Sequence, residues 1–229
     1  MKAVCLIPAR GGSKRLPRKN IVDFHGRPII SYTIEAALEC KIFEQVVVST
    51  EDDEIANIAQ YYGADIAKRK VSLASDTSRI VDVCLDFLET EDQRGCKYDV
   101  LGCLLATAPM RTAEHIRNAF DLLCKYDSNF VMAVTTYSKS PLQALRQEKD
   151  GTLNPMWPEW INIRSQNRPP VWVDNGSTYL ARVNTFRAER TFYGKGLRGY
   201  IMPREYSIDI DEPLDLEVAR FISDRTLNI

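Results

Sequence analysis

Short apolar runs alternate with segments of helical period along most of the chain. Runs of β-branched and aliphatic residues predict buried strands, because a strand covered on both faces needs no polar positions. Segments with apolar residues three and four positions apart predict amphipathic helices. Strands are expected at 2–7, 45–49, 65–68, 100–106, 130–136, 177–183 and 199–202, and helices at 28–40, 52–62, 81–88, 116–123 and 214–225. Since strands that alternate with helices form βαβ units, the pattern predicts an α/β fold with a mainly parallel sheet.

Single residues mark the ends of two predicted helices. Pro28 suits the first position of the first helix, where its missing N–H leaves no bond unmade. Thr50 or Asp52 can cap the second helix, and Gly63 is typical of a residue that ends one. Ligands of such sheets bind at the carboxyl ends of the strands, so the loop after the first strand is the first place to look for a site.

The regular alternation stops after about Tyr137. Residues 138–170 carry short polar segments, a turn at Asp150-Gly151, several prolines, and Trp157 and Trp160. We expect this segment to leave the sheet as an excursion within one domain that spans 1–229. Aromatic residues combined with proline outside the sheet pattern are typical of an interface, although ordinary core packing is the alternative. The segment therefore predicts a protruding element through which a homodimer forms.

The composition is that of an ordinary globular protein. Of the 229 residues, 45% are hydrophobic and 27% are charged, and 30 Lys+Arg against 31 Asp+Glu give a net charge of -1. Near-neutrality argues against broad binding of nucleic acid or of a membrane surface. No apolar run approaches the ~20 residues that span a bilayer. Because the apolar stretch at the start of the chain is also too short for a secretory signal, we expect a cytoplasmic protein.

The cysteines form neither the pattern of a disulfide framework nor that of a zinc site. The six cysteines include no C-x-x-C pair, and the chain has only two histidines. Cys84 and Cys124 lie in apolar segments of helical period. We therefore expect reduced, buried thiols in a cytosolic protein.

The strongest chemical signal is a loop rich in glycine and cations, directly after the first strand. It starts at Ile7 and reads I-P-A-R-G-G-S-K-R-L-P-R-K-N. Gly11 and Gly12 allow backbone N–H groups to approach an anion closely, while the arginines and lysines supply charge. A polyphosphate is the expected ligand, although the loop lacks the spacing of a Walker loop or of a dinucleotide fingerprint. A solvated basic loop is the alternative, and the position at the mouth of an α/β sheet argues against it.

Asp209-Ile210-Asp211 is the second signal. Two carboxylates two positions apart in an extended segment project to the same side. They could hold Mg²⁺, which prefers one or two carboxylates together with substrate phosphates and water. The alternative is a helix cap, because aspartate favours helix N-termini. Taken alone, the pair favours the cap.

A third and weaker signal lies near the strand expected at 177–183. Arg164-Ser165-Gln166, Asp174-Asn175-Gly176 and Tyr179 carry polar groups of the kind that line sugar sites. An ordinary polar loop is an equally good explanation of the same residues.

With those residues in view, the chain resembles the CMP-sialic acid synthetases, which are acylneuraminate cytidylyltransferases. The resemblance spans essentially the whole chain and rests on the loop from Ile7 and on V-V-V-S-T-E-D-D-E-I-A, G-A-D-I-A-K-R-K-V-S-L-A-S-D-T, A-T-A-P-M-R-T, R-S-Q and S-I-D-I-D-E-P-L-D-L. It implies a Rossmann-like nucleotidyltransferase fold with a protruding dimerisation element. It also implies an enzyme that transfers CMP from CTP to the anomeric hydroxyl of a nonulosonic acid, such as sialic, legionaminic or pseudaminic acid, and releases pyrophosphate with Mg²⁺ as cofactor.

The resemblance also implies roles for particular residues. Arg10, Lys19 and Asp211 would be catalytic. The nucleotide-binding set is Arg10, Gly11, Gly12, Ser13, Lys19, Asn20 and Arg69, in which Asn20 and Arg69 read the cytidine. The metal ligands are Asp209 and Asp211, and the sugar-binding set is Gln143, Arg164, Gln166, Asn175 and Tyr179.

Two departures from the family pattern bear on the acceptor. Many members have Q-P-T-S-P-L-R where this chain has A-T-A-P-M-R, so a glutamine is missing. Gln143 stands where some sialic acid enzymes have a lysine, which would suit the sugar carboxylate. Legionaminic or pseudaminic acid is therefore a candidate acceptor.

Three other functions remain compatible with the sequence. They are a Kdo cytidylyltransferase, a nucleotide-binding module without activity, and a metal-dependent glycosyltransferase that uses Asp209-Ile210-Asp211. The cationic loop argues against the glycosyltransferase, because such an enzyme has no triphosphate to hold there.

Overall fold

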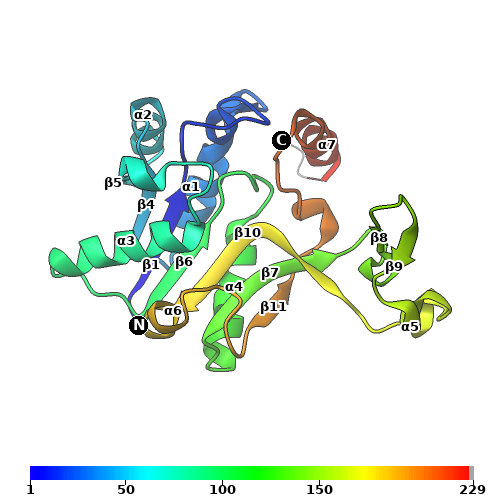
Figure 1. Cartoon of the computed structure of the whole chain (residues 1–229). Coiled ribbons are helices and arrows are strands. Elements are labelled where there is room, and N and C mark those ends of the chain that lie inside the picture. Colours follow the sequence, from blue (N-terminus) through cyan, green and yellow to red (C-terminus); the bar gives the residue numbers. More distant parts are fainter. Residues whose placement is uncertain (227–229) are drawn as a thin grey trace.

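A seven-stranded sheet forms the centre of the molecule. The computed structural model describes residues 1–226, and its strand order is β11-β7-β10-β6-β1-β4-β5 (Figure 1). The strands are β1 (Ala3–Pro8), β4 (Gln45–Thr50), β5 (Asp65–Lys68), β6 (Val100–Leu104), β7 (Phe130–Thr136), β10 (Trp172–Arg182) and β11 (Arg198–Ile201). Neighbours pair in parallel except β10, which runs antiparallel to β6 and β7. The expected α/β fold with a mainly parallel sheet is confirmed.

Helices cover both faces of the sheet. They are α1 (Ile29–Glu39), α2 (Asp53–Tyr61), α3 (Ile80–Gln93), α4 (Ala113–Lys125), α6 (Val183–Glu189) and α7 (Pro213–Thr226). Alternate residues of β1 enter opposite cores: Cys5 and Ile7 join a cluster with residues of α1, α2 and α4. Val4 and Leu6 join a cluster with residues of α3 and α6. Because β1 is buried on both faces, it reads as a continuous apolar run.

The C-terminal helix α7 packs against the segment between β1 and α1. Leu16 and Phe24 of that segment share a buried cluster with Ile210, Leu216 and Ala219. A short hairpin of β2 (Asp23–Phe24) and β3 (Arg27–Pro28) lies in the same segment. This packing brings residues before α7 next to the cationic loop, although the two are far apart in sequence.

Two of the three helix-end signals agree with the structure, and the third is displaced by one residue. The Asp52 side chain caps α2, since its Oδ1 accepts the Ile55 N–H at 3.0 Å. Gly63 follows α2 with a φ of +91°, which favours glycine. Pro28 stands one position before the first helical residue of α1 and not at that position, because its backbone is still extended there.

Three expectations about local structure were wrong. The helix α6 follows β10 directly and was not expected, and β10 begins at Trp172, earlier than the expected start of that strand. The expected unpaired thiols are confirmed, and four of the six are buried. Cys124 is exposed, however, because the buried residues of α4 are Ala113, Ile116, Ala119 and Leu123, on the other side of the helix.

Residues 138–170 leave the sheet, as expected, and project from one end of the molecule (Figure 1). The excursion contains β8 (Leu145–Gln147), β9 (Leu153–Pro155) and α5 (Pro158–Ile161). Several of its large apolar side chains are exposed, namely Leu145, Leu153, Met156 and Ile163, whereas Trp157 and Trp160 are half-buried. Within residues 1–226, no helix is both long enough and apolar enough to cross a membrane.

Candidate functional site

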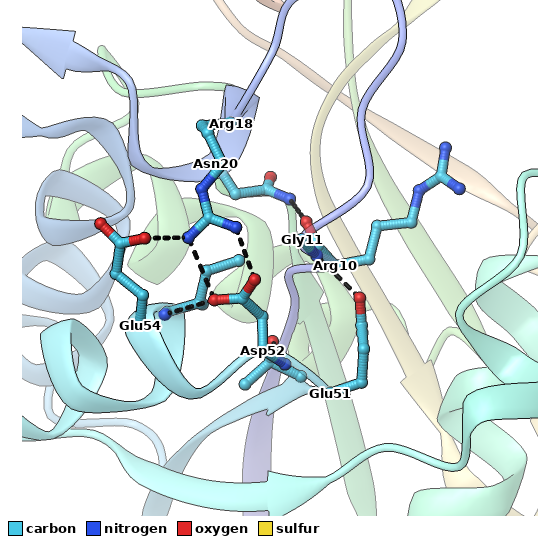
Figure 2. Close-up of polar contacts among 9 residues, drawn as sticks. Arg10, Gly11, Arg18, Asn20, Glu51, Asp52 and Glu54 are labelled. Atoms are coloured by element: carbon cyan, nitrogen blue, oxygen red, sulfur yellow. Dashed lines mark hydrogen bonds and ion pairs between the residues drawn. The ribbon is translucent and has the colours of Figure 1, made fainter.

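The loop after β1 is held in a closed turn at the carboxyl end of that strand. The Ala9 N–H donates to the Ser49 carbonyl at 3.0 Å, which continues the pairing of β1 with β4. The buried Asn20 side chain donates through Nδ2 to the Arg10 carbonyl at 2.9 Å (Figure 2). The two ends of the loop therefore meet, and the cations between them project from one small region.

Two of the loop cations share a carboxylate from the segment before α3. Arg10 Nη1 lies 2.6 Å from Asp76 Oδ1, and Lys14 Nζ lies 2.5 Å from Asp76 Oδ2. Hydrogen bonds from Lys14 and Arg10 hold the pKa of Asp76 below its usual value. The sequence did not single out Asp76, although it lies in the polar run S-L-A-S-D-T that carries the family resemblance.

Two further loop cations meet Asp211, which lies just before α7. Lys19 Nζ and Arg15 Nη2 each lie 2.6 Å from one of its carboxylate oxygens. Burial alone would raise the pKa of Asp211, but the hydrogen bonds from Lys19 and Arg15 outweigh it, and the pKa is lowered. The amide N–H groups at the start of α7 are bonded by Asp215, at 3.0 Å from that of Asp211. The cap expected as the alternative role of Asp211 is thus made by another side chain.

The Gly11 N–H is bonded within the protein, to a carboxylate that follows β4. This N–H donates to Glu51 Oε1 at 2.8 Å, and a Cβ placed at Gly11 would lie 2.3 Å from Asp52 Oδ2 (Figure 2). A Cβ at Gly12, by contrast, would meet nothing within 4 Å. Glycine is required at Gly11 because the loop passes close to Asp52, and the open side of the turn is at Gly12.

Two connected hollows lie beside the loop. A hollow of about 160 Å³ is lined by Arg10, Lys19, Asn20, Arg69, Ser75 and Thr107, among others. Another of about 320 Å³ is lined by Ser13, Lys14, Arg15 and Asp76, and both include Arg10, Lys19 and Asn20. The structure therefore brings the whole predicted nucleotide set to one place except Gly11 and Gly12, which belong to the same loop.

Arg69 forms the floor of the smaller hollow and is only 7% exposed. Its Nη2 donates to the Ser49 carbonyl at 2.7 Å, and its Nε donates to the Ser49 hydroxyl at 3.2 Å. Burial lowers the pKa of Arg69. These bonds use two of the five N–H donors of the guanidinium and hold it at the carboxyl end of β4.

A third hollow, of about 320 Å³, lies beside β10. Its lining includes Asp174, Asn175, Tyr179, Ser207 and Asp209. The Tyr179 hydroxyl donates to the Asp174 carboxylate at 2.8 Å, and Asn175 Nδ2 donates to the Ser207 hydroxyl at 3.0 Å. Asn175 and Tyr179 thus line the same hollow, and Asp174, the partner of Tyr179, was part of the same sequence signal.

Asp209 is the least satisfied carboxylate of the site. Its Oδ1 is buried and has no hydrogen-bond partner among residues 1–226. The pKa of Asp209 is raised to about 6, mainly because the carboxyl is shielded from water. A hydrogen bond with the Thr107 side chain lowers this pKa in part, and the negative charge of Asp211 raises it. Asp209 and Asp211 therefore lie near each other in different surroundings, one buried without a cation partner and one held by two cations.

Three of the expected sugar-binding residues lie elsewhere in the chain. Gln143, Arg164 and Gln166 are exposed on the excursion and line none of the three hollows. One copy of residues 1–226 does not bring them to Asn175 and Tyr179. Asn175 and Tyr179 therefore share a hollow in one chain, and the sugar-binding role of all five residues stays a prediction.

Arg111 is a buried residue that holds the backbone beside the third hollow, and the sequence did not assign it a role. It is 2% exposed, and its Nη1 donates to the carbonyls of Ser177 at 2.7 Å and Leu105 at 3.3 Å. Burial lowers its pKa to about 10. The side chain joins β10 to the end of β6, and its position in A-T-A-P-M-R-T was the only sequence signal for it.

A cationic hollow at the carboxyl ends of β1 and β4, on a sheet covered by helices on both faces, is typical of nucleotide-binding α/β proteins. Residues 4–219 match the family model described as cytidylyltransferase, and the chain belongs to this family.

Named relatives resemble the chain over almost its whole length. It is 34% identical to the pseudaminic acid cytidylyltransferase of Campylobacter jejuni, over 97% of this chain and 96% of the relative. It is also 34% identical to the CMP-N,N'-diacetyllegionaminic acid synthase of Legionella pneumophila, over 94% and 93%. The N-acylneuraminate cytidylyltransferase of Escherichia coli is 31% identical, over 95% of this chain and 51% of that longer protein.

Solved structures share the fold at low sequence identity. A CMP:2-keto-3-deoxy-manno-octonic acid synthetase complexed with CTP has a TM-score of 0.70 and 18% identity, and the match covers 98% of this chain and 99% of that one. A 4-diphosphocytidyl-2C-methyl-D-erythritol synthase from Anaerococcus prevotii has a TM-score of 0.68 and 12% identity, over 98% and 99%. The expected Rossmann-like nucleotidyltransferase fold is confirmed.

Proposed function

We propose that the protein transfers CMP from CTP to the anomeric hydroxyl of a nonulosonic acid and releases pyrophosphate. The arrangement of the hollows carries the proposal. Leu105 lines both the 160 Å³ cationic hollow and the third hollow beside β10, so the two are neighbours. A nucleotide held by Arg10 and Lys19 would then lie next to an acceptor held near Tyr179. The relatives named above act on pseudaminic, legionaminic or N-acylneuraminic acid by their names, which supports the acceptor class.

In this proposal the protein acts mainly by position and charge. The anomeric hydroxyl loses its proton to a base and attacks the α-phosphorus of CTP in line, the bond to the bridging oxygen breaks, and pyrophosphate leaves with the negative charge. Arg10 and Lys19 neutralise that charge, and Ser13 lies in the same hollow. Asn20 and Arg69 face the smaller hollow, where the cytidine would be read.

The carboxylates before α7 fit a hard cation. Asp209 Oδ1 is a buried acceptor without a partner, and Asp211 supplies a second carboxylate nearby. No cluster of three or more His, Cys, Asp or Glu side chains occurs within residues 1–226, so phosphate and water oxygens would complete the shell. We propose that Asp209 and Asp211 hold Mg²⁺, which would neutralise phosphate charge when bound. Lys19 and Arg15 must then release Asp211.

A screen of acceptors tests the proposed function. Pyrophosphate release from CTP and Mg²⁺ should be measured with sialic, legionaminic, pseudaminic and Kdo acids. We expect release with legionaminic or pseudaminic acid, because the two relatives of 34% identity named above carry the names of these acids. Release with Kdo alone would identify a Kdo cytidylyltransferase. Consumption of a CMP-sugar, without any pyrophosphate, would identify the glycosyltransferase.

We also propose a homodimer that forms through residues 138–170. Leu145, Leu153 and Met156 are each more than half exposed on this excursion, which has few contacts that would bury them in a single chain. Exposed apolar surface of this kind marks a partner site. Light scattering at micromolar concentration is expected to give twice the mass of 26.1 kDa. A monomer mass would contradict the proposal, and Leu145→Lys with Leu153→Lys should produce one.

A further inference from the structure

The cationic loop is fixed from its far side by carboxylates that follow β4 (Figure 2). Glu51 Oε1 accepts the Gly11 N–H at 2.8 Å. The backbone ladder between β1 and β4 reaches Pro8 and Ser49, and the bond from Ala9 N–H to Ser49 adds one more step. Glu51 thus continues the connection between the two strand ends with a side chain, at the point where backbone pairing stops.

A second anchor holds the other end of the loop. Arg18 pairs with Asp52 and with Glu54, both at the start of α2. The hydrogen bond from Arg18 lowers the pKa of Asp52, which also caps α2. The Arg18 side chain is therefore engaged by carboxylates of the protein, and the other cations of the loop line the hollow.

Glu51 differs from the other two acids in having no cation bonded to it. Its Oε2 is buried and has no hydrogen-bond partner among the described residues. Its charge acts on Arg69, where burial lowers the pKa and Glu51 partly restores it. A carboxylate so close to a polyphosphate site weakens anion binding by its charge. Its hydrogen bond with the Gly11 N–H fixes the backbone of the loop, and this effect on geometry offsets the unfavourable charge.

We propose that Glu51 is a positioning residue for the nucleotide phosphates. By holding the Gly11 N–H, it sets the path of the turn, so that the neighbouring Arg10 side chain faces the hollow. The contact that matters is the hydrogen bond to an acceptor oxygen at this distance, and not the negative charge. The inference rests on the proposed use of the hollow for CTP.

Two conservative changes separate the hydrogen bond from the charge. Glu51→Gln keeps an acceptor oxygen at the same reach and removes the charge. Its NH₂ group takes the place of Oε2, which accepts no hydrogen bond from the described residues, so no existing bond is lost. Glu51→Asp keeps the charge and shortens the side chain, so the Gly11 N–H is no longer reached. Each variant should be titrated with inorganic tripolyphosphate and with cytidine, and its kcat/KM for CTP and its thermal midpoint should be measured.

We expect Glu51→Gln to stay within about twofold of the wild type in every measurement. Glu51→Asp should lose about tenfold in tripolyphosphate affinity and in kcat/KM for CTP, as for one lost hydrogen bond to a charged group. Its cytidine affinity and thermal midpoint should not change. The reverse order of the two variants, or wild-type behaviour of both, overturns the inference, as does an equal loss for cytidine. A wild-type protein that binds no tripolyphosphate refutes the proposed CTP site itself.

Discussion

Lys19→Ala is expected to lower turnover by at least about tenfold, since one charge-assisted contact to phosphate contributes about 1.5–3 kcal/mol. Lys19 lines both cationic hollows, and its side chain is only 20% exposed. Arg10→Ala should have an effect of the same size, because Arg10 lines the same two hollows. Steady-state kinetics with CTP and the active acceptor measure both effects.

Lys125→Ala is a matched control for these two variants. It removes the same charge from the exposed C-terminal end of α4, next to the start of β7 and thus at the amino ends of the parallel strands, opposite the site. Its kinetics should equal those of the wild type. Near-normal turnover in both Lys19→Ala and Arg10→Ala would remove the assignment of the loop to the phosphates.

Asp211→Asn is expected to leave folding intact while turnover collapses and the Mg²⁺ requirement rises. The change preserves shape, and the start of α7 keeps its bonds from Asp215. An amide oxygen is a weaker ligand for a hard cation than a carboxylate is. CTP affinity without metal should stay within a few-fold, because Lys19 and Arg15 supply that contact and lose only a competing carboxylate. Kinetics over a range of Mg²⁺ concentrations and a thermal melt test this.

Asp215→Ala provides the opposite pattern as a control. It removes the acceptor of the amide groups of Asp211 and Glu212, so the thermal midpoint should fall while the Mg²⁺ requirement stays the same. If Asp211→Asn instead shows wild-type melting and wild-type turnover at limiting Mg²⁺, the metal role of the pair is wrong.

The strands and most helices could be predicted because their burial is periodic and local. The start of β10 could not, since Asp174 to Ser177 is a polar run with a glycine, which reads as a loop. In the structure Trp172 to Asp174 pair with β7, and the rest of the run lies in a shift of register between Asp174 and Tyr179. The helix α6 has only seven residues and is held mainly by the burial of Val183 and Phe186, so its pattern is too short to recognise.

The cationic loop and the aspartate pair could be found because the residues of each are close in sequence. Their partners could not, because Asp76 and Asp52 reach the loop only through the fold. The requirement for glycine at Gly11 likewise depends on the approach of Asp52, which no local pattern records. The resemblance to a family grouped Gln143 with Tyr179, and one folded chain does not bring them together.

The ion pairs of Asp76 and Asp211 make binding at this site an exchange of anions. The loop cations already hold two carboxylates, one shared by Arg10 and Lys14 and the other by Arg15 and Lys19. A ligand must displace both to reach all four cations, and each displacement gives up ion pairs that are partly shielded from water. A single small anion such as inorganic phosphate can replace only one carboxylate and gains almost nothing by doing so. A chain of linked phosphates replaces both at once, so the internal carboxylates act as a filter that favours polyphosphates over the far more abundant simple anions.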